Sequence, residues 1–264
     1  MKLYRLCKIY SAYLRKGIAA FVQYPADQII SALSLVVQQT AAFVGLWAIL
    51  SAAGNLGGWY FPDILLLYSF ALMISALDNA LFDGVWNIGN VYIRMGRMDI
   101  LLTRPLSPFF QLICHRFEFS AFGLFFIALG LSLWALHSTG AAISASLLLW
   151  YPLFLTCGVA ITTSIFLIFN AFNFWLIRGN EIADLSQTVQ EFAKYPQHIF
   201  PKAMQFIMAF VLPYAFTTYF PASVLSGRLP FVSIVQLLLV TACSIIAAKF
   251  IWHIGLKSYN STGS

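Results

Sequence analysis

Long apolar stretches constrain this chain more than any other feature of its sequence. A helix that crosses a bilayer needs about 20 mostly apolar residues. Five stretches meet that requirement, and they are Gln28–Ser51, Pro62–Phe82, Phe117–Leu136, Ala142–Asn170 and Phe231–His253. The composition agrees, because 61% of the 264 residues are hydrophobic and only 9% are charged, whereas charged residues make up about 25% of a soluble domain. We therefore expect an all-α integral membrane protein.

A sixth span is expected between the fourth and last stretches, where two interpretations are open. In the first, Ala203–Phe220 crosses directly, although Pro213 and Pro221 interrupt or end its apolar run. In the second, the more polar Ile182–Phe200 crosses, and residues 203–226 form a broken helical pair that dips into the outer leaflet. Backbone that is not helical occurs at membrane depth only where protein or water covers it. Hydropathy alone favours the first interpretation, and both predict six spans.

The basic residues indicate how the spans are oriented. Lys and Arg gather in the short cytoplasmic loops of membrane proteins. With Ala203–Phe220 as the fifth span, fourteen of the fifteen Lys and Arg residues fall on one side, and Arg228 alone falls on the other. Both termini are therefore expected in the cytoplasm. The net charge of +6 then reflects topology, and no nucleic-acid partner is expected, because the cations are spread along an apolar chain.

Residues 1–24 have the pattern of an amphipathic helix. Apolar side chains such as Leu6, Leu14 and Ile18 recur at helical spacing on one face, and the basic residues share the other face, namely Lys2, Arg5, Lys8, Arg15 and Lys16. Such a helix lies in the membrane interface with its cations near anionic headgroups. It is either a simple membrane anchor or a lever that contacts a cytoplasmic partner and leads into the first span.

The loop between the second and third spans has a centre at residues 96–108 that predicts a short helix. The pattern fits a helix over Arg97–Leu102, which Pro105 ends. The residues expected to act there are Arg97, Asp99, Leu101, Leu102, Arg104 and Pro105. An apolar centre flanked by charges suits docking to a soluble protein. The alternative is a solvated loop that lies on the headgroups.

Ionisable groups near the bilayer are candidates for a transport pathway. Two sets stand out, Asp78, Asn79 and Asp83 at the inner end of the second span, and Glu181, Asp184 and Gln187 further on. The first set either lines a cytosolic entrance with negative charge or makes ordinary hydrogen bonds to neighbouring helices. The second set lines the fifth span if Ile182–Phe200 crosses, and is otherwise a solvated cytosolic face.

The sequence contains none of the usual signatures of catalysis. No G-x-x-x-x-G-K-[ST] motif occurs to hold nucleotide phosphates, and no HExxH, GxSxG or GxGxxG occurs either. The four histidines lie far apart, so no metal site is expected. We therefore expect no catalytic residues and no bound cofactor in this chain.

The order of these features resembles a known family. The loop reads G-x-x-D-x-L-L-x-R-P from Gly96 to Pro105, and prolines interrupt the segment before the last span at Pro196, Pro201, Pro213 and Pro221. Together with six spans and a basic amphipathic N-terminus, this pattern resembles the permease subunits of ABC-2 type transporters, in particular an uncharacterised subgroup of similar length. The resemblance covers nearly the whole chain.

The resemblance implies an exporter of the type V architecture in a bacterial cytoplasmic membrane. The helix around Arg97–Arg104 would be the coupling helix that sits on a cytosolic ABC ATPase. Two copies of that ATPase would bind ATP and Mg, and a second copy of this permease or a paralogue would complete the pathway for a hydrophobic or amphipathic substrate. The family's outer-leaflet helices favour the second interpretation of residues 203–226. An ATP-independent secondary transporter and a membrane scaffold are the rival functions, although no inverted repeat is evident.

Overall fold

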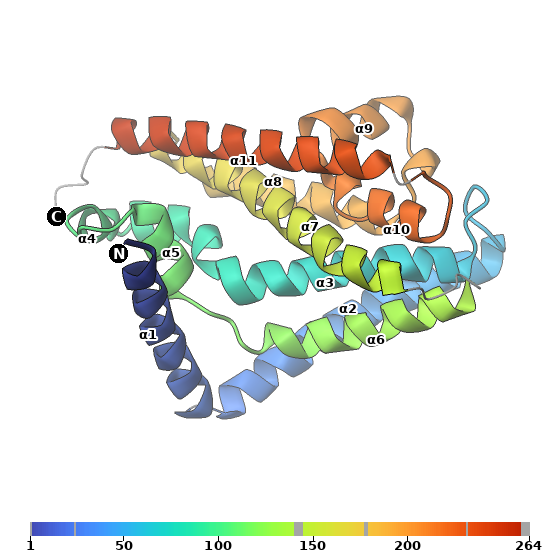
Figure 1. Ribbon diagram of the computed structural model, residues 1–264, viewed down its shortest axis with the longest axis horizontal. Coiled ribbons are helices and arrows are strands. Elements are labelled where there is room, and N and C mark those ends of the chain that lie inside the picture. The colour runs from blue at the N-terminus through green and yellow to red at the C-terminus, as the bar shows by residue number, and fades with distance from the viewer. Residues whose placement is uncertain (1, 24, 140–144, 177–178, 231, 260–264) are drawn as a thin grey trace.

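The chain folds into a bundle of helices packed around one central helix (Figure 1). The computed structural model describes residues 2–23, 25–139, 145–176, 179–230 and 232–259. The longer helices are α1 (Lys2–Gln23), α2 (Pro25–Ala53), α3 (Phe61–Trp86), α6 (Ala121–Ser138), α7 (Ala145–Ala171), α8 (Gly179–Glu191) and α11 (Ser233–Ser258). The shorter elements are η1 (Ile88–Ile93), α4 (Met98–Leu102), α5 (Pro108–His115), η2 (Phe172–Phe174), η3 (Phe192–Lys194), η4 (Gln197–Ile199), α9 (Lys202–Phe206), η5 (Ile207–Val211), η6 (Tyr214–Phe216) and α10 (Tyr219–Leu225).

Helix α3 is the core of the bundle because its sequence is apolar on every face. Every residue from Asp63 to Ile74 is buried, as expected for a helix with no polar stripe. The helix packs mainly against α6, α7 and α5. Its start is fixed by Pro62 in the first turn and by the Asp63 carboxylate, which accepts a hydrogen bond from the Tyr60 backbone at 3.3 Å.

Glycines allow two further helices to approach closely. A side chain at Gly158 of α7 would collide with Ile74 of α3, and a side chain at Gly255 of α11 would collide with Phe174 in η2. Helix α7 packs against α3 on one side and along α11 on another. Small residues at such crossings are typical of helix pairs in membranes, where close van der Waals contact replaces the hydrophobic effect.

Helix α2 lies at the edge of the bundle, and α1 meets it at a sharp angle (Figure 1). Among the described residues of α2, only Leu46 and Leu50 are buried. It packs against α6, and the Tyr68 hydroxyl of α3 donates to its Gln39 carbonyl at 2.8 Å. Pro25 begins α2, as expected for a joint between two helices.

The segment after α8 is a bent pair rather than a straight span. Residues 202–211 and 214–225 meet at 78° across a break at Pro213. Both ends of the pair lie at the same end of the bundle, because His198 before it and Arg228 after it bond to the loop Leu56–Gly58. Helix α8, by contrast, starts beside Asn173 and leads to His198, so it passes along the bundle. Residues 203–220 therefore do not form one straight helix.

The remaining helices agree with the spans and short helices predicted from the sequence. In the described part of the chain, five helices are long and apolar enough to cross a membrane, and they correspond to the five apolar stretches. The amphipathic N-terminal segment is helix α1, and the short loop helix is α4. The all-α membrane fold is thus confirmed.

Candidate functional site

The exposed face of α4 forms the first part of the candidate site. Met98 and Leu101 point into the protein and are 0% and 3% exposed. Ile100 and Leu102 point outward and are 54% and 44% exposed, and the exposed side chains around them are Arg97, Thr103, Arg104 and Pro105. The result is an apolar patch rimmed by arginines. Leu101, which the sequence grouped with the docking residues, instead anchors α4 in the protein.

Buried polar contacts hold α4 in place. The Gln111 side-chain amide of α5 donates to the carbonyl oxygens of Leu101 at 2.8 Å and Leu106 at 3.0 Å. Gly84 of α3 has no room for a side chain against the Leu112 carbonyl, so α5 in turn lies directly on α3. Displacement of α4 would therefore be passed to α5 and to the central helix.

Asp99 of α4 lies beside Tyr259, which follows α11. Burial raises the pKa of Tyr259, and the neighbouring carboxylate raises it further. This contact places the end of the last long helix against the short loop helix.

Helix α1 rests on the segment that leads into α6. Tyr10 meets Phe117 edge to face at 5.6 Å between ring centroids, and Phe21 meets Phe119 at 5.9 Å. Arg104 reaches the Tyr13 hydroxyl at 3.5 Å, which links α1 to the end of α4. The basic residues expected on the outer face are exposed where described, at Arg5, Lys8, Arg15 and Lys16, and the Lys2 side chain lies outside the described part.

The two acidic residues in the C-terminal part of α3 differ in their surroundings: Asp78 is enclosed and Asp83 is paired. Asp78 is 2% exposed and accepts hydrogen bonds from Thr163 of α7 at 2.5 Å and from Trp86 at 3.2 Å. Asp83 forms an ion pair with Arg116 at 2.5 Å. Asn79 and Asp83 line a separate shallow depression. Asp78 thus connects α3 to α7. This arrangement is the one in which Asp78 makes ordinary hydrogen bonds to a neighbouring helix.

Helix α8 carries a polar face that no described part of this chain covers. Glu181, Asp184 and Gln187 are exposed, whereas Ala183 and Ser186 face the bundle. The structure therefore places the three polar residues on the outside of α8, away from Asp78. The buried Lys194, just after α8, bonds to Glu191 at 2.5 Å and to Gln39 of α2 at 3.4 Å, and so links the two segments.

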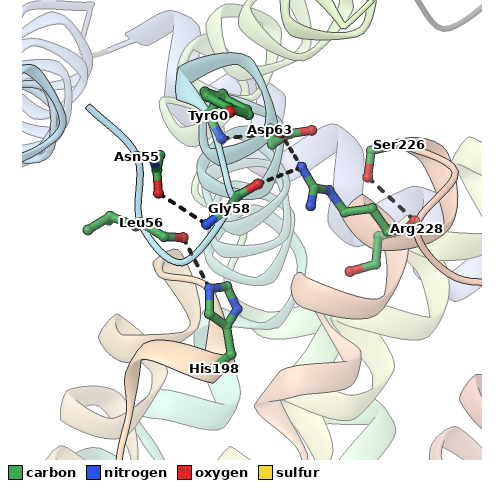
Figure 2. Close-up of polar contacts among 9 residues, drawn as sticks. Asn55, Leu56, Gly58, Tyr60, Asp63, His198, Ser226 and Arg228 are labelled. Atoms are coloured by element: carbon green, nitrogen blue, oxygen red, sulfur yellow. Dashed lines mark hydrogen bonds and ion pairs between the residues drawn. The ribbon is translucent and has the colours of Figure 1, made fainter. Parts of the chain in front are cut away.

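The opposite end of the bundle is closed by contacts that the sequence did not reveal (Figure 2). His198 contacts the Leu56 carbonyl at 3.1 Å. Arg228 donates to the Gly58 carbonyl at 3.1 Å and pairs with Asp63 at 2.6 Å. Gly58 has a φ of +83°, which favours glycine. In the sequence, the glycine-rich loop that contains Gly58 and the isolated cation Arg228 were the signals that could have indicated these contacts.

The described residues contain no group of three or more His, Cys, Asp or Glu side chains that could hold a metal ion. The elements of the candidate site are the patch on α4, helix α1, and the exposed faces of α2 and α8.

Comparison with known proteins gives one match. A family model described as ABC-2 family transporter protein matches residues 36–263. No curated protein and no solved structure matches the chain. The matched range includes α4, α8, the bent pair and α11, and it begins within α2.

Proposed function

Because this chain belongs to the ABC-2 transporter family, we propose that it is the permease subunit of an ATP-driven exporter. The observation that carries the proposal is the exposed patch of Ile100 and Leu102 on α4, rimmed by Arg97 and Arg104. Apolar centres with charged rims are typical of protein interfaces. The occupant of the patch is a cytosolic ABC ATPase, which binds ATP and Mg and is present in two copies.

The orientation follows from the end of the bundle that carries α4. Basic residues of α1 and α4 gather at this end, so it lies in the cytoplasm of a bacterial cell with both termini. The bent pair of residues 202–225 then lies at the outer end and dips into the outer leaflet. Its break near Pro213 faces α7 and α11 across a cavity of about 520 Å³, so protein surrounds it on that side.

A second permease covers the exposed faces of α2 and α8. An aspartate at the centre of a helix costs about 2.5–3.5 kcal/mol in lipid, so the face with Asp184 and Glu181 does not face acyl chains. Helix α2, which Lys194 links to the end of α8, adds the exposed Val37 and Trp47. The partner is another copy of this chain or a paralogue, and the hydrophobic or amphipathic substrate passes between the two subunits.

Movement starts at the ATPase and spreads through two contacts of α4. Closure of the ATPase dimer pushes on α4, and Gln111 transmits the push to α5 and α3. Arg104 transmits it to α1 through Tyr13. Since packed helices move as rigid bodies, the bundles tilt and expose the pathway outward.

Reconstitution tests the proposal. The permease–ATPase complex is placed in proteoliposomes, and ATP hydrolysis is measured against a panel of amphiphiles, lipids and peptides. We expect a subset of amphiphiles to stimulate hydrolysis and to be moved only when ATP and Mg are present. A variant of the ATPase that lacks its P-loop lysine is the control. Movement of the same amphiphiles by the permease alone would identify a secondary transporter instead.

A further inference from the structure

A cavity of about 370 Å³ lies between α7 and α11, next to α3 and α5, and the proposed function does not use it. Its walls are mostly apolar and include Phe82, Phe109, Leu167, Ile245 and Trp252. The volume lies within the range of about 300–1,000 Å³ that is usual for ligand pockets. A cavity with such walls suits a hydrocarbon chain.

The cavity lining contains one cationic side chain, that of Lys249, and one histidine, His253. Lys249 and His253 lie four residues apart on α11, and therefore on one face of that helix, and both are exposed. No acidic residue belongs to the lining. Asp78 lies behind the wall, but it is 2% exposed and accepts a hydrogen bond from Thr163. The mouth therefore favours an anion.

The cavity lies at the level where the bundle reaches the headgroups. Phe82 in its wall precedes Asp83, whose ion pair with Arg116 is open to solvent on the arginine side. Phe109 belongs to α5, which follows the α4 loop and is outside the spans. Lysine side chains at this depth extend toward phosphate groups. An apolar cavity with a basic mouth at this level matches the two parts of a phospholipid.

We propose that this cavity binds an anionic phospholipid from the leaflet at the α4 end. One acyl chain fills the apolar part, and the phosphate lies between Lys249 and His253. Basic pockets between membrane helices bind anionic headgroups in this way. The bound chain contacts Trp252 and Phe109, whose rings lie 6.4 Å apart edge to face. It thereby joins α11 to the segment that holds α4.

Native mass spectrometry of the full chain in non-ionic detergent measures retention of phosphatidylglycerol and phosphatidylcholine. We expect the wild type to retain phosphatidylglycerol in preference. Lys249→Ala should weaken its retention roughly fivefold, whereas Lys257→Ala should not. Lys257 is the matched control, because it is an exposed lysine on the same helix but outside the cavity. Equal retention of the two lipids, or equal effects of the two variants, would overturn the proposal.

A second pair of variants tests the place of the acyl chain. Ala160→Leu narrows the cavity, and Ala242→Leu adds the same bulk to an exposed position of α11 outside it. The probe is phosphatidylglycerol with brominated acyl chains, which quench tryptophan fluorescence. The quenching of Trp252 is obtained as the difference from Trp252→Phe. It should fall in Ala160→Leu and stay unchanged in Ala242→Leu. Unchanged quenching in Ala160→Leu would show that the chain lies elsewhere. Displacement of the lipid by millimolar inorganic phosphate alone would also overturn the proposal, because it would identify a simple phosphate site.

Discussion

The guanidinium of Arg228 lies 2.6 Å from the carboxylate of Asp63, which joins two residues 165 positions apart. The same side chain donates to the Gly58 carbonyl and stacks over the Trp59 ring at 4.7 Å. Asp63 is in the first turn of the central helix α3, and Arg228 follows the bent pair of residues 202–225. A single arginine therefore fastens the bent pair to the core of the bundle.

Replacement of Arg228 should destabilise the outer end of the bundle. In Arg228→Met, the largely buried Asp63 carboxylate loses its partner, so the free energy of unfolding should fall by about 1–3 kcal/mol. Thermal unfolding in detergent measures the change. Asp63→Asn and the double variant complete a double-mutant cycle. If the losses in the free energy of unfolding were strictly additive, they would contradict a direct coupling between the two side chains.

Asp78 should matter through its hydrogen bonds rather than its charge. Asp78→Asn keeps an acceptor for Thr163 and should unfold near the wild-type temperature. Asp78→Ala leaves Thr163 and Trp86 without their acceptor in a buried place and should lower stability by about 1–3 kcal/mol. Transport by the two variants is measured beside their unfolding. Loss of transport in a fully stable Asp78→Asn would show instead that the carboxylate acts on the substrate.

The exposed face of α8 should lie at the interface of two permeases. Single cysteines at Asp184, Thr188 and Glu191, in a background with Cys7 and Cys243 replaced by serine, should form disulfide-linked dimers on oxidation. A C2 interface brings the same position of both subunits together near its axis. Phe126→Cys on α6, equally exposed but outside that face, is the control. Dimers through position 126 but not through α8 would place the interface elsewhere.

The fold could be predicted from the sequence wherever hydrophobicity alone determines it. The five long spans follow from runs of apolar residues, and α4 follows from a short apolar core that ends before Pro105. Hydropathy alone could not predict the bend in residues 203–220. Both a straight span and a bent helical pair in the membrane require an apolar composition. Pro213 marks the break in the sequence, but the path of the bent pair also depends on bonds to the distant loop Leu56–Gly58, which no local pattern encodes.

The site was predictable only in part for a similar reason. The charges on α4 and α1 were visible as a pattern, but the inward direction of Leu101 depends on Gln111 and α5. Asp78 was noticed as an ionisable residue in a span. Its role as a link between α3 and α7 required the position of Thr163, which is 85 residues away.

The central claim is that α4 docks an ATPase, and co-purification of that ATPase tests it most directly. The tagged permease is isolated from its native cells, and bound P-loop ATPase is quantified for the wild type, Ile100→Asp and Lys257→Asp. Ile100 is exposed at the centre of the patch, whereas Lys257 is an exposed residue of α11 at the same end of the bundle. We expect the ATPase to co-purify with the wild type and with Lys257→Asp. It should be lost from Ile100→Asp, and the thermal stability of that variant should be unchanged. Equal recovery with Ile100→Asp, or a permease that transports with no ATPase bound, would contradict the account.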